Sequence, residues 1–185
     1  SDIILIAFDL NKSANIFKNN KNNFKRVIDT QRLVRSIDQI HLLDGKGKII
    51  ISTGFFEIIP KTIETDGPPG AFSIGNAITE LGGDVIYLIE NHTKNFIDQE
   101  NNTIIFPNTS KEESLKFSQQ IIEEYNPSVL ISIERCGITE KNRYLNISSQ
   151  DISDYNALID VLFDLHKNTI GIGDGGNEIG MGNLY

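Results

Sequence analysis

Three parts of the chain combine carboxylates with glycines, and each directly follows a stretch that we expect to be a β-strand. They are residues 52–55 with 64–70 (STGF and ETDGPPG), residues 134–137 (ERCG) and residues 173–182 (GDGGNEIGMG). Carboxylates in such loops can move protons, hold an ammonium group or ligate a metal ion. Glycine permits positive φ and lets a ligand approach backbone N–H groups, which can form an anion-binding nest. These residue types together predict a small-molecule site.

The elements that must position these loops alternate along residues 48–185. Short β-branched runs predict strands, and longer runs with apolar residues three or four positions apart predict helices. The predicted strands are residues 49–51, 85–89, 103–106, 129–133 and 169–172, and the predicted helices are residues 71–81, 115–125 and 153–166. This alternation predicts a three-layer, Rossmann-like α/β fold, with a mostly parallel sheet and helices on both faces. Ligands bind outside the carboxyl ends of strands in such sheets, which is where the three acidic loops fall.

We expect residues 1–185 to form a single α/β domain with a helical N-terminal region over residues 1–47. Apolar spacing predicts a helix over residues 27–43, which glycines then terminate. Residues 11–25 are rich in Asn and Lys and predict a polar loop.

The composition of the chain indicates which classes of molecule it can bind and which compartment suits it. The net charge is −8 and the isoelectric point about 4.9, so phosphate backbones and anionic lipid surfaces are repelled. We therefore expect no nucleic-acid and no membrane partner. The single cysteine, Cys136, suits a reducing compartment, and its sequence neighbours favour a packed residue over a nucleophile. With no signal-peptide pattern and no apolar run of roughly 20 residues, a cytoplasmic location is expected.

Each acidic loop also has a purely structural interpretation. Asp66 could be the N-cap of a helix whose first turn holds two prolines. Asp174 and Asn177 could be ordinary turn residues, and Glu134 with Arg135 could be a surface pair of little energetic value. The occurrence of three such loops at one edge of a sheet favours function over these alternatives.

Residues 171–176 also match the G-x-G-x-x-G pattern of dinucleotide-binding loops. Asp174 would place a negative charge beside the pyrophosphate, so we exclude an NAD site. No organic cofactor is expected. A divalent metal such as Mg²⁺ or Mn²⁺, held by Asp66, Asp174 and Glu178, is an alternative because hard cations prefer oxygen ligands.

The same motifs resemble the D-glutamate cyclase-like C-terminal domain family. The matching stretches are TGF at 53–55, ETDGPPGA at 64–71, ER with a following glycine at 134–137, and IGDGGNEIGMG at 172–182. The resemblance implies an α/β domain and, for some members, a hydro-lyase that interconverts D-glutamate and 5-oxo-D-proline. The family usually has proline where this chain has Cys136. The family domain also continues past the GDGGNE motif, so a sheet that is incomplete at the C-terminus, and completed by an additional domain or a homo-oligomer, is expected.

Lactam formation requires a base for the ammonium proton, donors for the oxyanion and a cation for the α-carboxylate. We expect Asp66 or Asp174 to be the base, and Glu134 or Glu178 to be a second proton carrier or orienting group. The backbone of Gly175, Gly176 and Asn177 is the expected oxyanion site, and Arg135 the expected carboxylate clamp. The remaining expected substrate-binding residues are Thr53, Gly54, Thr65, Gly67 and Gly173. The alternative is a non-catalytic domain that binds an amino acid or a phosphorylated metabolite through the Gly175–Gly176 nest.

Overall fold

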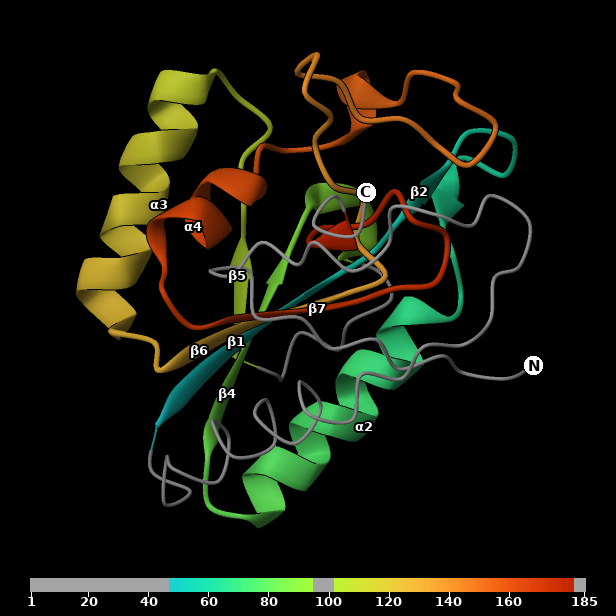
Figure 1. Ribbon diagram of the computed structural model, residues 1–185. Coiled ribbons are helices and arrows are strands. Elements are labelled where there is room, and N and C mark those ends of the chain that lie inside the picture. Colours follow the sequence, from blue (N-terminus) through green and yellow to red (C-terminus); the bar gives the residue numbers. More distant parts are fainter. Residues whose placement is uncertain (1–46, 95–101, 182–185) are drawn as a thin grey trace, which may run out of the picture.

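The computed structural model describes residues 47–94 and 102–181. The predicted helix over residues 27–43 and the polar stretch at 11–25 lie outside the described residues. Five parallel strands form one sheet in the order β5-β4-β1-β6-β7 (Figure 1). The strands are β1 (Lys48–Thr53), β4 (Asp84–Ile89), β5 (Thr103–Ile105), β6 (Val129–Ile133) and β7 (Thr169–Ile172). A two-stranded antiparallel hairpin, β2 (Phe56–Glu57) and β3 (Thr62–Ile63), follows β1.

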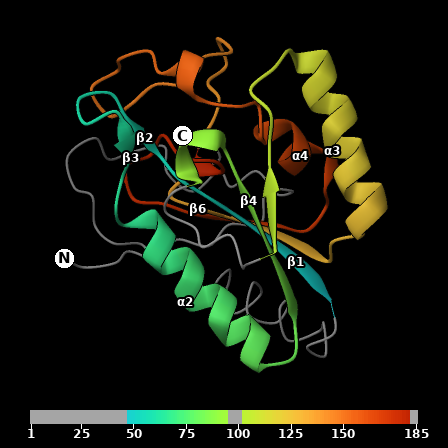
Figure 2. The same ribbon diagram turned by 180° about the vertical axis from the view of Figure 1, so that it is seen from behind.

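Helices cover both faces of the sheet, which confirms the predicted α/β architecture. Helix α2 (Gly67–Glu80) lies on one face, and α3 (Lys111–Tyr125) and α4 (Asp160–Leu165) lie on the other (Figures 1 and 2). Within the part of the chain that the structure describes, no helix has the length and apolar character needed to cross a membrane.

The central strand shows why the core has two halves. Successive side chains of a strand point to opposite faces, so Ile49 and Ile51 pack toward α2, and Ile50 packs toward α3 and α4. All three isoleucines are almost completely buried. Burial of each contributes about 1.5–3 kcal/mol to folding. This double-sided burial explains why the strands read as continuous β-branched runs.

The strand order places a topological switch point beside β1. The chain builds outward from β1 through β4 to β5, then returns to place β6 on the other side of β1 and β7 beyond it. In doubly wound sheets the loops diverge at such a switch point, and ligands bind there. Because Thr53 pairs with Ile133, Gly54 and Glu134 leave the sheet side by side.

One predicted helix is mostly wrong. Residues 153–166 contain a 3₁₀ turn at Ser153–Tyr155, extended backbone at Asn156 and only the short helix α4. Ala157 explains the interruption, because its N–H donates to Glu90 and its carbonyl accepts hydrogen bonds from Arg135 and Tyr144. These long-range bonds replace the local bonds that a continuous helix would need.

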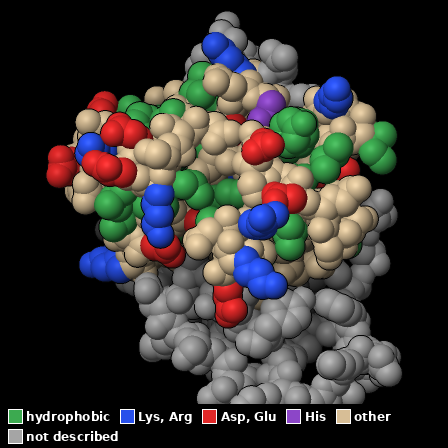
Figure 3. All heavy atoms as spheres, turned by 90° about the horizontal axis from the view of Figure 1, so that it is seen from above, with side chains coloured by type: hydrophobic (Ala, Val, Ile, Leu, Met, Phe, Trp, Pro, Cys, Tyr) green, Lys and Arg blue, Asp and Glu red, His purple; other side chains and the backbone are tan. Residues whose placement is uncertain are grey.

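The hairpin β2–β3 and the long connection over residues 138–155 lie at the upper right of the molecule in Figure 1. Phe56 of the hairpin stacks on Tyr155 of the connection, with ring centroids 4.2 Å apart. Figure 3 looks onto this end, where acidic, basic and hydrophobic side chains are interspersed.

Helix α3 begins with a side-chain N-cap. Ser110 has extended backbone, and its Oγ accepts a hydrogen bond from the Glu113 N–H at 3.3 Å. Replacement of Ser110 by Ala should remove about 1 kcal/mol of unfolding free energy and lower Tm by about 2–4 °C. Thermal unfolding measures the effect, with exposed Ser148→Ala as the control. An unchanged Tm in the Ser110 variant would show that the cap contributes nothing.

Candidate active site

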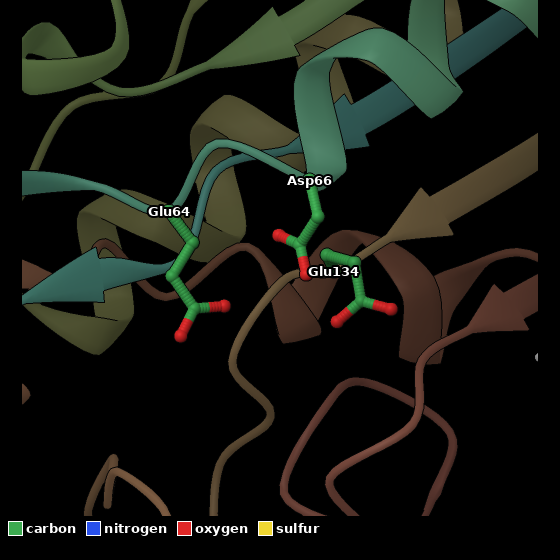
Figure 4. A group of neighbouring side chains, drawn as sticks. All are labelled: Glu64, Asp66 and Glu134. Carbon is green, nitrogen blue, oxygen red and sulfur yellow. The ribbon is translucent and has the colours of Figure 1, made fainter. Parts of the chain in front are cut away.

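Five carboxylates gather where the strands around the switch point end. Glu64 follows β3, Asp66 precedes α2, Glu134 follows β6, and Asp174 and Glu178 follow β7. One oxygen each of Glu64, Asp66 and Glu134 lie within 4.8 Å of one another, and the same holds for Glu134, Asp174 and Glu178. Figure 4 shows the first group, whose side chains come from the hairpin, the start of α2 and the end of β6. The structure therefore brings together all four predicted catalytic carboxylates and adds Glu64.

Glu134 belongs to both groups and has an unusual backbone. Its φ is 46°, in the left-handed region that non-glycine residues seldom adopt. Its N–H donates to the Ile172 carbonyl at 2.9 Å, which ties the loop after β6 to β7. A Cβ on Gly67 would lie 2.9 Å from Glu134 Cβ and 2.7 Å from Thr53 Oγ1, so this position has room only for glycine. Gly67 thus allows the start of α2 to approach Glu134.

The surroundings of Glu134 favour a protonated carboxyl. Burial, and after it the charges of Glu178, Asp174, Asp66 and Glu64 in decreasing order of importance, together raise the pKa of Glu134 to about 8. A group with a pKa near neutrality can both donate and accept protons at physiological pH.

The pKa of Glu64 is also raised toward neutrality, for partly different reasons. Burial raises its pKa to about 8, assisted by a hydrogen bond with the Glu57 side chain and by the charge of Asp66. The Glu64 N–H donates to the Phe55 carbonyl at 2.8 Å, which fixes the base of the hairpin. The sequence reasoning did not assign Glu64 a role, although it lies in the ETDGPPG motif two residues before Asp66.

Asp66 combines the structural and the functional interpretation. Its Oδ1 accepts a hydrogen bond from the Gly67 N–H at 2.9 Å, so it is the N-cap of α2, as the structural alternative predicted. The side chain is exposed, and its carboxylate also lies beside Glu134. Asp66 therefore serves both as a helix cap and as a member of the acidic cluster.

The loop after β7 differs from the expected oxyanion site. The N–H groups of Gly175 and Gly176 donate to the carboxylate of Glu178, at 2.6 and 2.8 Å. The Asn177 side chain donates to the Leu145 carbonyl at 2.9 Å. The backbone N–H groups of Gly175 and Gly176 are already engaged within the protein, so their predicted role in an oxyanion site is corrected to one of loop ordering. Asp174 remains exposed, with its carboxylate in the cluster.

Arg135 is not a substrate clamp. Its side chain is completely buried, and its terminal nitrogens donate to Glu90 at 2.8 Å, to Asn156 at 2.7 Å and to the carbonyls of Cys136 and Ala157. Burial acts to lower its pKa, but Glu90 and other acidic groups raise it above the usual value, so the guanidinium stays charged. The predicted role is therefore corrected to a structural one, in which Arg135 joins the loops after β4 and β6 to residues 156–157.

Glu90 was missed although the rule that found the other loops applies to it. It directly follows β4 and is 4% exposed. One of its oxygens accepts hydrogen bonds from Arg135 and the Ala157 N–H, and the other lies 3.0 Å from His92 Nε2. The available signal in the sequence was its position, because Glu90 is an acidic residue that directly follows the predicted strand at residues 85–89.

The other predicted substrate-binding residues have varied positions. Thr53 is buried at the end of β1, and Gly54 has a φ of 111° against the Thr93 side chain. Thr65 is exposed, and Gly173 passes beneath the side chain of Glu178.

Cys136 is packed inside the protein, as expected from the sequence. It is 0% exposed, its Sγ lies 3.5 Å from the Leu145 carbonyl, and burial raises its pKa to about 12. The thiol therefore stays neutral at physiological pH.

The fold and the site define a Rossmann-like α/β domain with an acidic cluster at its topological switch point. The family model "D-glutamate cyclase-like, C-terminal" matches residues 12–185, and the chain belongs to this family. It is similar to the human protein named D-glutamate cyclase, mitochondrial, with 29% identity over 164 residues. That alignment covers 74% of this chain and 26% of the human protein, so the match spans about a quarter of the relative's length.

Proposed function

We propose that the acidic cluster catalyses a D-glutamate cyclase-type hydro-lyase reaction, the interconversion of D-glutamate with 5-oxo-D-proline and water. The main support is the pair Glu64 and Glu134, two carboxyls with pKa values raised to about 8 that lie together at the switch point. Family membership and the name of the human relative favour this reaction over other proton-transfer chemistry.

The proton balance of cyclisation explains the need for several carboxyl groups. A bond forms between the amino nitrogen and the γ-carboxyl carbon, and a carbon–oxygen bond of that carboxyl breaks. The ammonium loses two protons to become the lactam N–H, and the departing oxygen gains two to leave as water. In our proposal ionised Asp174 or Asp66 accepts an ammonium proton, and protonated Glu134 donates to the departing oxygen. Glu64 donates the second proton to the departing oxygen and accepts the second proton from the nitrogen.

The cluster attracts the substrate ammonium but repels its carboxylates. Because Arg135 is buried, we propose Mg²⁺ or Mn²⁺ as an alternative source of positive charge. Glu64, Asp66 and Glu134 would supply the oxygen ligands that these ions prefer.

The decisive experiment follows interconversion by chiral chromatography. The purified chain is incubated with D-glutamate, 5-oxo-D-proline and both L-enantiomers, each with EDTA, Mg²⁺ or Mn²⁺. Turnover restricted to the D-enantiomers supports the proposal, and loss of that turnover in EDTA supports the metal. Calorimetric binding of 5-oxo-D-proline without turnover favours the non-catalytic binding domain. Neither binding nor turnover by folded protein overturns both.

Replacement of Asp174 by Asn should lower kcat by about 10²–10⁴-fold, the usual contribution of a general base. Its side chain is exposed, so we expect no change in Tm. Asp164→Asn, on the exposed surface of α4, is the matched control and should keep the original rate. Unchanged turnover in the Asp174 variant would remove this residue from the mechanism.

A further inference from the structure

The side chain of Glu178 folds back onto its own loop. Its Oε1 accepts hydrogen bonds from the N–H groups of Asp174 at 3.1 Å and Gly175 at 2.6 Å, and its Oε2 accepts one from Gly176 at 2.8 Å. Glu178 is 5% exposed. Three backbone donors thus converge on one buried carboxylate, and hydrogen bonds to an ionised acceptor are the strong ones.

The backbone of Glu178 is fixed independently of this side chain. Gly137 N–H donates to the Asn177 carbonyl and Ile179 N–H donates to the Arg135 carbonyl, both at 2.8 Å. Cys136 and Glu178 pair as an antiparallel bridge between these bonds. Residues 177–179 are therefore attached to the loop that carries Glu134. Residues 174–176 depend on the Glu178 carboxylate for three of their backbone bonds.

We propose that Glu178 is a positioning residue for the reaction, whose carboxylate holds backbone residues 174–176 and so keeps the Asp174 side chain beside Glu134. The role rests on the proposed function, because Asp174 matters only if it acts on the substrate. The hydrogen bonds to residues 174–176 can be tested without any turnover. Of the two roles expected from the sequence, proton carrier or orienting group, this proposal assigns Glu178 the second.

A carboxylate is required because both oxygens must accept. In the Glu178→Gln variant one oxygen becomes an NH₂ group, which places a donor against a backbone N–H donor. At least one bond is lost, and residues 174–176 should move out of position. The Glu178→Asp variant keeps the carboxylate on a side chain that is one methylene shorter, so it tests the effect of side-chain length separately from that of charge. Glu140→Gln, an exposed site, is the control.

The first measurement is amide hydrogen exchange by ¹⁵N NMR. We expect exchange of the Asp174, Gly175 and Gly176 amides to accelerate at least about 10-fold in both Glu178 variants, while the amides of β6 keep their protection. Unchanged exchange in a folded variant would overturn the proposal. This result does not depend on catalysis, so absence of turnover in the wild-type chain would count against the proposed function alone.

The second measurement is a double-mutant cycle on kcat with Glu178→Gln and Asp174→Asn. A residue that acts through Asp174 should lower kcat by about 10–100-fold in the original chain but have almost no further effect once Asp174 is replaced. KM should change little, because the loop positions Asp174, whose proposed role is proton transfer. Multiplicative effects in the double variant would show that Glu178 acts independently, and the positioning role would fail.

Discussion

Replacement of Glu134 by Gln should lower kcat by about 10³-fold and yet raise Tm by about 3 °C at pH 8. The loss of rate follows because Glu134 is the carboxyl common to the two clusters of acidic residues. The gain in stability follows from the removal of a partly buried carboxyl that other acidic groups repel. Residues selected for catalysis often reduce stability in this way.

The pKa of Glu134 determines the direction in which the stability of the wild type changes with pH. The pKa of Glu134 is about 4.5 in the unfolded chain and about 8 in the folded protein. Between these values the folded state binds more protons than the unfolded state, so this group makes stability fall as pH rises, and the loss is complete above pH 8. Below pH 4.5 the group makes no difference. The Gln variant should therefore match the wild type near pH 4.5 and exceed it at pH 8.

Thermal unfolding from pH 4.5 to 9 measures this difference, and the chiral assay measures kcat. Glu123→Gln on the exposed surface of α3 is the matched control. A Glu134→Gln variant that is less stable than the wild type at pH 8 would contradict the proposed electrostatic strain.

Replacement of Arg135 by Met should destabilise the protein by about 3–5 kcal/mol, or about 10 °C in Tm. Methionine fills a similar volume, but Glu90 is then left buried without its positive partner. Addition of Glu90→Gln to the Arg135→Met variant should recover part of the loss, because the stranded charge is removed.

Arg143 provides the control for this experiment. It also forms an ion pair with a carboxylate, Asp151, at 2.6 Å, but the two side chains are 62% and 39% exposed. Such surface pairs contribute about 0–1 kcal/mol. Urea unfolding of the Arg135→Met and Arg143→Met variants compares the buried ion pair with the exposed one directly. Equal effects would mean that the interior network around Arg135 is not essential to the fold.

The strands were predictable from sequence because burial on both faces leaves a local signature. The run at residues 129–133 is rich in β-branched residues and completely buried, and its limits agree with the structure. The helix predicted over residues 153–166 failed because bonds to Glu90 and Arg135, distant in sequence, hold Ala157 in another conformation. Apolar periodicity carries no information about such partners.

The candidate site was predictable as a set of positions but not as a set of roles. Strand ends identified Glu134 and Asp174 because the carboxyl ends of parallel strands share one edge of the sheet. Arg135 is adjacent to Glu134 in sequence, yet the left-handed backbone at Glu134 precedes an arginine that lies in the interior. Whether a charged side chain meets solvent or a buried partner depends on contacts that neither its type nor its position reveals.

Cys136 gives this chain a natural chemical reporter. It is the one thiol in the sequence, and it lies beside Arg135, on the loop that also carries Glu134. Because it is fully enclosed and its thiol stays neutral, an aromatic disulfide reagent can react only when this loop opens. The labelling rate therefore reports how often this loop opens in the unmodified protein, and its slowing by a bound molecule would reveal binding at the acidic cluster without any assay for product.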